Sequence, residues 1–265
     1  MNITFIGGGV MGEAIVSAAL EGGVFTPGEV TVCEIIATRR EVLAARYGVA
    51  VTDDIQSSIA GADVVIAAVK PQELTKIGGR AVPASALIIS ILAGTTSKSL
   101  AAAFGHDRII RVMPNTPVAA RAGMSVWYAT PAVSPDQQAF AQRLLSSFGR
   151  EIYVDDEAKI DMATALSGSG PAYVFLFIEA LIEGGVSIGL PRAYAEEMAL
   201  QTVLGSAQYM QAVGRSAGDL RAAVTSPAGT TAAGLLEMER HAFRAAVIDG
   251  VRAAHQRAKE LGEPV

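Results

Sequence analysis

The sequence predicts an α/β protein in which an N-terminal Rossmann-like, doubly wound parallel sheet is followed by an all-α C-terminal dimerisation domain. In the first half, short β-branched runs alternate with helical patterns, which is typical of βαβ units. After Asp155-Asp156 the strand signals stop, and only Ala- and Leu-rich helical patterns follow. We therefore expect a Rossmann domain over residues 1–155 and a helical domain over residues 156–265.

The elements of the first domain follow from local patterns. Buried strands are expected at Ile3–Ile6, Val30–Cys33, Val49–Val51, Val64–Ala68, Leu87–Leu92 and Ile109–Val112. Helices are expected between them at Gly12–Leu20, Thr38–Tyr47, Asp54–Ala60, Gln72–Gly78 and Ser97–Phe104. Met124–Ala129 and Ile152–Val154 flank a helix that begins near Pro135 and extend the sheet.

The second domain consists of amphipathic and apolar helical segments. They are expected at Glu157–Leu166, Pro171–Ile188, Arg192–Ala212, Ala217–Val224, Thr230–Met238 and Ala242–Leu261. The chain is 51% hydrophobic, and its helices carry more apolar surface than a single thin helical bundle can bury. We therefore expect a homo-oligomer whose helices intertwine. The most apolar stretch, Ala172 to Leu190, is interrupted by Glu179 and Glu183, so no membrane span is expected.

Charge and composition exclude several classes of function. The net charge is −5 and the basic residues are scattered, which argues against nucleic-acid binding. Cys33 is the single cysteine and the three histidines lack ligand spacing, so neither disulfides nor a metal site is expected. The first strand begins by residue 3, which leaves no room for a targeting peptide. We expect a cytoplasmic protein.

A glycine-rich turn between the first strand and the first helix predicts a dinucleotide site. The turn reads Gly7-Gly8-Gly9-Val10-Met11-Gly12, a GxGxxG motif. The first glycine permits the tight turn, the second lets the backbone approach a pyrophosphate, and the third allows close packing of helix and strand. The helix N-terminus then faces the phosphates with its positive end.

The residues after the second strand leave the identity of the dinucleotide open. Glu34 follows that strand about 20 residues beyond the turn, where an acid usually accepts the ribose 2′-OH of NADH. Thr38-Arg39-Arg40 lies shortly after it and is suited instead to the 2′-phosphate of NADPH. The sequence alone does not choose between NADH and NADPH.

Two further strand ends face the crevice in which such folds bind ligands. Val69-Lys70-Pro71 follows the fourth strand, and Asn115 follows the sixth. We expect Lys70 and Asn115 to contact the ribose and the nicotinamide amide, with Pro71 fixing its loop.

A small anion site is predicted in the helical domain. Ser226-Pro227-Ala228-Gly229-Thr230-Thr231 places hydroxyls and a glycine directly before an apolar helical run. Free backbone N–H groups at such a helix start, together with the hydroxyls, are suited to a carboxylate. A simply capped helix start has the same pattern and stands as the alternative.

The residues of the helical domain favour reduction of an imine over that of a hydroxy acid. A hydroxy-acid dehydrogenase needs a base for the alcohol proton, and related enzymes use a Lys at a helix start in the second domain. Here no Lys occurs between Lys159 and Lys259. An iminium already carries its proton, so it requires chiefly orientation and a dry pocket.

The chain resembles the pyrroline-5-carboxylate reductases. The resemblance runs nearly end to end, through the first glycine turn, Ala68–Pro71, Met113–Pro117, Gly168–Phe175 and Val224–Thr231. It implies NADPH- or NADH-dependent reduction of 1-pyrroline-5-carboxylate to L-proline, the last step of proline biosynthesis. It also implies homodimers, often assembled into decamers.

The resemblance also assigns residues. It implies that Ser226, Gly229, Thr230 and Thr231 bind the substrate carboxylate, and that Thr231 relays the proton to the ring nitrogen. Many members carry Gly where this chain has Ala228. A β-hydroxyacid-type dehydrogenase and a non-catalytic dinucleotide-binding protein remain the alternatives.

Overall fold

The computed structural model describes residues 1–262. Its eight strands form one sheet in the order β3-β2-β1-β4-β5-β6-β7-β8. Neighbouring strands from β3 to β6 run parallel, β7 runs antiparallel to β6, and β8 runs parallel to β7. The strands are β1 Ile3–Ile6, β2 Val30–Cys33, β3 Ala50–Thr52, β4 Val64–Ala67, β5 Leu87–Ser90, β6 Ile109–Met113, β7 Gly123–Ala129 and β8 Gly149–Tyr153. The predicted Rossmann-like sheet is confirmed.

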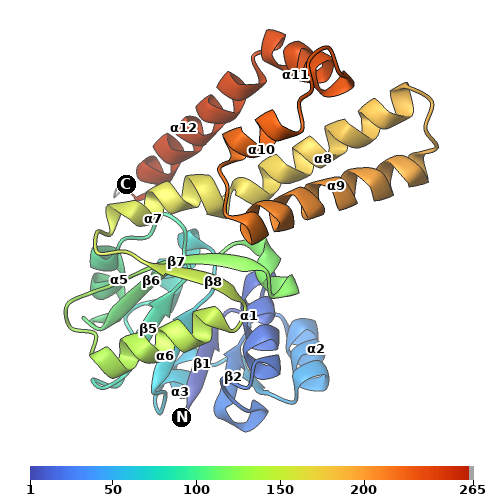
Figure 1. Ribbon diagram of the computed structural model, residues 1–265. Helices are drawn as coiled ribbons and strands as arrows, with labels where there is room; N and C mark the ends of the chain where they lie inside the picture. Colours follow the sequence, from blue (N-terminus) through green and yellow to red (C-terminus); the bar gives the residue numbers. More distant parts are fainter. Residues whose placement is uncertain (263–265) are drawn as a thin grey trace. The chain divides into compact units, whose positions relative to one another are not determined.

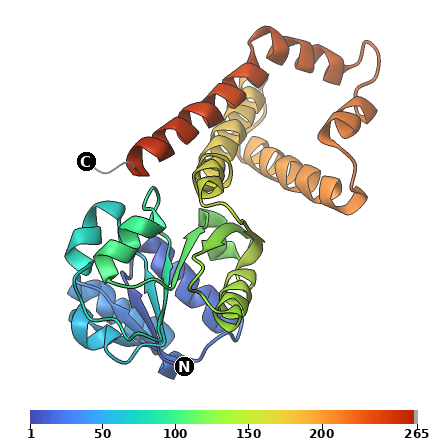
Figure 2. The same cartoon turned by 90° about the vertical axis from the view of Figure 1, so that its left-hand side faces the viewer.

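Helices cover both faces of this sheet (Figures 1 and 2). They are α1 Val10–Glu21, α2 Ala37–Tyr47, α3 Ile55–Ile59, α4 Leu74–Ile77, α5 Ser97–Phe104 and α6 Pro135–Ser146. Successive residues of a strand point to opposite faces, so Phe5 joins the core under α1, α2 and α6. Ile6 joins the core under α3, α4 and α5. The sheet is therefore buried on both sides, as its β-branched runs predicted.

Helices alone follow the sheet among the described residues. They are α7 Ala158–Ala163, α8 Gly170–Ser187, α9 Arg192–Val213, α10 Ala217–Ala223, α11 Thr230–Arg240 and α12 Phe243–Gly262. A π-helical turn, Thr164–Gly168, separates α7 from α8 and was not expected. Within this region α8 and α9 form an antiparallel hairpin (Figure 1), with Gly185 lying close against Ala195.

The chain divides into two compact units at points that differ from the expected boundary after residue 155. The first unit is Met1–Ser169 together with residues 253–262, and the second is Gly170–Arg252. The first unit keeps α7 because the side chain of Arg111, on β6, pairs with Glu157 and Asp161. The sequence pattern predicts where the strands end, whereas these ion pairs determine that α7 belongs to the first unit.

The segment Ala158–Ser187, which includes α8, is long and apolar enough to span a membrane by length and composition alone. The mean hydropathy of its most apolar 18-residue window is 1.5, and only 6% of that window is buried within the chain. Phe175 and Leu176 of α8 are both more than half exposed. The apolar surface that the composition predicted is thus concentrated on the helices of the second unit.

Candidate functional site

The glycine-rich turn lies between β1 and α1, at the carboxyl edge of the sheet. Gly7 has φ +106°, and a Cβ there would lie 2.6 Å from the carbonyl oxygen of Ala68. A Cβ on Gly12 would collide with the Gly7 carbonyl, so neither position accommodates a side chain. Gly9 differs, because nothing lies within 4 Å of the position a Cβ would take. The space beside Gly9 is open for a ligand.

The start of α1 supplies hydrogen-bond donors to that space. Gly9 is the N-cap residue, and no side chain caps the helix. The first N–H groups of Val10 and Met11 therefore remain available, at the positive end of the helix. An open glycine beside an uncapped helix fits the pyrophosphate of a dinucleotide.

A pocket of about 370 Å³ continues from this turn across the carboxyl ends of β1, β2 and β4. The order β3-β2-β1-β4 places it where the winding of the sheet reverses, which is where such folds bind ligands. Its walls include the predicted residues Gly7, Gly9, Glu34, Val69 and Lys70, along with exposed Ile35 and Ile36. The structure thus brings together residues that are far apart in the sequence.

Glu34 is buried in this pocket and fixed by two backbone amides. Gly8 N–H donates to its Oε2 and Ile36 N–H donates to its Oε1, both at 2.9 Å. The carboxylate therefore belongs to the same framework as the glycine turn.

Arg39 is also held in place beside the turn. Its Nη2 lies 2.6 Å from the Gly8 carbonyl oxygen and 2.6 Å from Oε2 of Glu13. Burial acts to raise the pKa of Glu13, but hydrogen bonds from Arg39, Tyr47 and Arg46 outweigh it and lower that pKa. Arg39, on α2, thus binds the glycine turn directly and binds α1 through the ionised Glu13.

Asn115 makes structural contacts at the end of β6. Its Oδ1 accepts from Met124 N–H at 2.8 Å, and its Nδ2 donates to the carbonyl oxygen of Ser167 at 3.1 Å. One N–H of this amide binds Ser167, so its second N–H is the donor that remains for the predicted contact with the nicotinamide. Pro71 starts a 3₁₀ turn directly after Lys70, so its ring fixes that loop as the sequence suggested.

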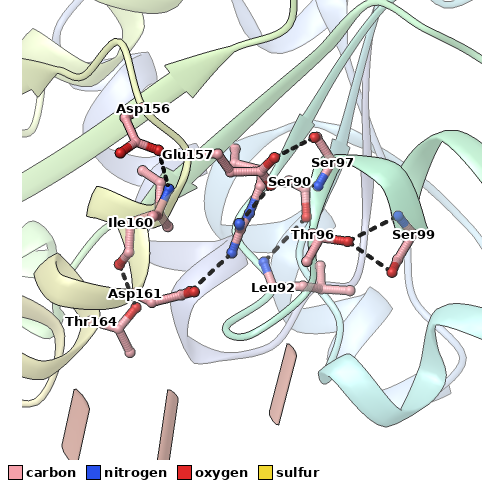
Figure 3. A network of polar contacts seen from close by, with 12 residues as sticks. Ser90, Leu92, Thr96, Ser97, Ser99, Asp156, Glu157, Ile160, Asp161 and Thr164 are labelled. Atoms are coloured by element: carbon pink, nitrogen blue, oxygen red, sulfur yellow. Dashed lines mark hydrogen bonds and ion pairs between the residues drawn. The ribbon is translucent and has the colours of Figure 1, made fainter. Parts of the chain in front are cut away.

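An ionic network around the buried Arg111 joins β6 to α7 (Figure 3), and sequence reasoning missed it. Arg111 is 3% exposed and lies 2.6 Å from Glu157 Oε1 and 3.4 Å from Asp161 Oδ1. The N–H and hydroxyl of Ser97 donate to the two oxygens of Glu157. Burial acts to raise the pKa of Glu157, but these bonds lower it. The available signal was an arginine inside the apolar run Ile109–Met113.

The second candidate site lies in the second unit, at the start of α11. The N-cap is Gly229, and no side-chain bond caps the helix, which argues against a simply capped turn. Ser226, Thr230 and Thr231 are exposed, and none of their hydroxyls has a hydrogen-bond partner within residues 1–262. Uncapped amides beside free hydroxyls suit a small carboxylate.

The backbone of this loop is tightly constrained. Ala228 has φ +56°, in the left-handed region that favours glycine. A Cβ on Gly229 would overlap the hydroxyl oxygen of Ser226. The left-handed Ala228 turns the chain so that the Ser226 hydroxyl lies against Gly229, at the start of the helix.

Comparisons with known proteins identify the family. Residues 157–261 match the family model for pyrroline-5-carboxylate reductase dimerisation, and residues 2–94 match that for NADP oxidoreductase, coenzyme F420-dependent. The pyrroline-5-carboxylate reductase of Synechocystis is 42% identical over 99% of both chains. The chain belongs to the pyrroline-5-carboxylate reductase family.

Solved members of the pyrroline-5-carboxylate reductase family share the whole fold. The enzyme from Coxiella burnetii has a TM-score of 0.90 and 36% identity, with 99% of each chain covered. The Plasmodium falciparum enzyme, solved with NADP bound, has a TM-score of 0.90 and 28% identity, covering 99% of this chain and 98% of its own. The predicted membership is confirmed, and the dimerisation match supports the predicted homo-oligomer.

Proposed function

We propose that this protein reduces the C=N bond of 1-pyrroline-5-carboxylate with NADPH or NADH and releases L-proline. One observation carries the proposal. A chain of this family combines an open glycine turn for a dinucleotide with an uncapped, hydroxyl-lined helix start for a carboxylate. Gly7–Gly12, Glu34, Val69, Lys70 and Pro71 form the proposed dinucleotide site, with Arg39 bracing it.

The loop at α11 has two tasks in this reaction. The amides of its first turn and the hydroxyls of Ser226 and Thr230 hold the substrate carboxylate. That anchor orients the ring, which is the main requirement for an already activated iminium. The residues of the glycine turn would hold the reduced dinucleotide, which would supply the hydride. Thr231, the second residue of α11, then exchanges the proton at the ring nitrogen.

The described residues support this reaction over the two alternatives. A β-hydroxyacid-type dehydrogenase requires a base, and no Lys occurs between Lys159 and Lys259. A non-catalytic dinucleotide-binding protein has no need of the intact loop from Ser226 to Thr231.

Replacement of Thr231 tests the proposal. We expect the purified protein to oxidise NADPH or NADH only when pyrroline-5-carboxylate is present, with proline as the product. Thr231→Ala is expected to lower kcat by about 100-fold, the scale of one general acid–base group, without changing the Kd for the dinucleotide. Thr231→Ser keeps the hydroxyl and serves as the control. Wild-type turnover in Thr231→Ala would remove Thr231 from the mechanism, and turnover with a 3-hydroxy acid alone would refute the function.

We infer a cytoplasmic protein whose dimers assemble into a decamer, as the family resemblance suggests. The exposed apolar residues of α8 are then covered by partner helices instead of lipid. Light scattering on the purified protein measures the mass. A protein that sediments with membranes, or stays monomeric, contradicts this inference.

A further inference from the structure

We propose that Glu34 makes this protein prefer NADH over NADPH, because a fixed carboxylate occupies the pocket wall at the end of β2. The inference rests on the proposed function in one respect, namely that the pocket holds a reduced dinucleotide. It departs from the names of similar proteins, since one solved relative has NADP bound and residues 2–94 match an NADP oxidoreductase family.

The hydrogen bonds of Glu34 prevent it from turning away. Both carboxylate oxygens accept backbone N–H groups, from Gly8 in the glycine turn and from Ile36 before α2. A rotated side chain would leave both amides unpaired, and Gly8 is buried. The carboxylate keeps further lone pairs, which are suited to the two hydroxyl donors of an unmodified ribose.

A 2′-phosphate presents the opposite chemistry to this carboxylate. It offers acceptor oxygens where Glu34 needs donors, and it carries a charge near −2, as phosphate monoesters generally do. At hydrogen-bond distance two such anions repel strongly in a partly buried site. Binding of NADPH therefore requires a cation that neutralises the phosphate.

The two nearby arginines are engaged elsewhere. Arg39 pairs with Glu13 at 2.6 Å and also donates to the Gly8 carbonyl. Arg40 pairs with Asp53 at 3.0 Å and donates to the backbone carbonyl of Glu34 at 2.7 Å. A turn of either guanidinium toward a 2′-phosphate breaks an existing ion pair.

The remaining charges of the pocket balance one another. Lys70 and Lys76 line it together with Glu34 and Glu73, so its walls carry equal numbers of cations and anions. Lys76 lies 3.5 Å from Glu73 in an ion pair of its own. The pocket thus has no surplus of positive charge to receive the additional phosphate.

Binding of fragments without imino acid tests the inference independently of catalysis. Calorimetry on the purified protein would compare NADH with NADPH, and ADP-ribose with its 2′-phosphorylated form. We expect the unphosphorylated ligand of each pair to bind at least about tenfold more tightly. Equal or tighter binding of the phosphorylated ligands overturns the proposal and indicates that Lys70 or Lys76 neutralises the phosphate.

Variants then assign the preference to one residue. Glu34→Gln is expected to shift the ratio of the two Kd values toward the phosphorylated ligands by about tenfold or more. Glu41→Gln on the exposed surface of α2 removes the same charge and is expected to leave the ratio unchanged. An unchanged ratio of the two Kd values in Glu34→Gln overturns the assignment of the preference to Glu34. If Glu34→Gln has a markedly lower Tm than the wild type, Glu34→Ser repeats the test. A protein that binds NADH more tightly than NADPH but does not reduce the imine would refute the proposed reaction and leave the cofactor preference standing.

Discussion

Replacement of Arg111 by Met is expected to weaken the attachment of α7 to the sheet. The substitution keeps the unbranched stem and removes the guanidinium that pairs with Glu157 and Asp161. Removal of one partner from a buried ion pair typically costs about 3–5 kcal/mol. Glu157 and Asp161 are 26% and 20% exposed, and Ser97 still binds Glu157 in the variant. We therefore expect the lower end, about 3 kcal/mol in the free energy of unfolding.

The assay is thermal unfolding followed by circular dichroism. A loss of about 3 kcal/mol corresponds to a fall in Tm of about 6 to 12 °C for a protein of this size class. Lys159→Met serves as the control, since it removes one positive charge from α7 and breaks an exposed ion pair with Asp155. Such surface pairs contribute at most about 1 kcal/mol, so its Tm should change by only a few degrees.

The pH dependence provides a second test of the same network. The pKa of Glu157 is lowered from 4.5 in the folded chain, so its contribution to stability is present above that value. The contribution is lost as the pH falls through the lowered, folded-state pKa. The gap in stability between wild type and Arg111→Met should therefore shrink in acid. This account of Arg111 would be refuted if the difference in stability between the two proteins stayed constant from pH 7 into acid. It would also be refuted if the substitution lowered the Tm by less than about 2 °C.

Substitutions at three further positions test the two sites. Gly7→Ala should lower the Tm and abolish dinucleotide binding, because its φ of +106° and the nearby Ala68 carbonyl leave no place for a Cβ. Gly9→Ala should leave the Tm unchanged, because its Cβ would meet no protein atom within 4 Å. It should raise the Kd for the dinucleotide, because the Cβ would enter the space proposed for that ligand, and a lower Tm would contradict this reasoning. Ala228→Val should raise the KM for the imino acid at least several-fold without altering the dinucleotide Kd, while Ala228→Gly retains the wild-type KM, because φ is +56° at this position. Equal KM values in both variants would show that the strained backbone is irrelevant.

The sequence by itself determined the elements and the chemistry that depends on neighbours along the chain. Hydrophobic periodicity predicted strands such as Ile3–Ile6 and helices such as Ser97–Phe104. An element that is buried on one face, or on both, repeats its apolar residues at a fixed spacing along the chain. The GxGxxG turn and the Ser226–Thr231 loop are short motifs whose backbone geometry follows from glycine, proline and a helix start. Their combination was enough to indicate the family.

Only the tertiary structure decided which of these groups are free to act. Glu34 and Gly8 are 26 residues apart, and Arg111 and Glu157 are 46 apart, so their contacts depend on the order of strands in the sheet. The π-helical turn, the two contacts of Asn115 and the place of α7 in the first unit have the same origin. Local pattern records burial and turn preference, whereas the partner of a charged or amide side chain is selected by packing between distant segments.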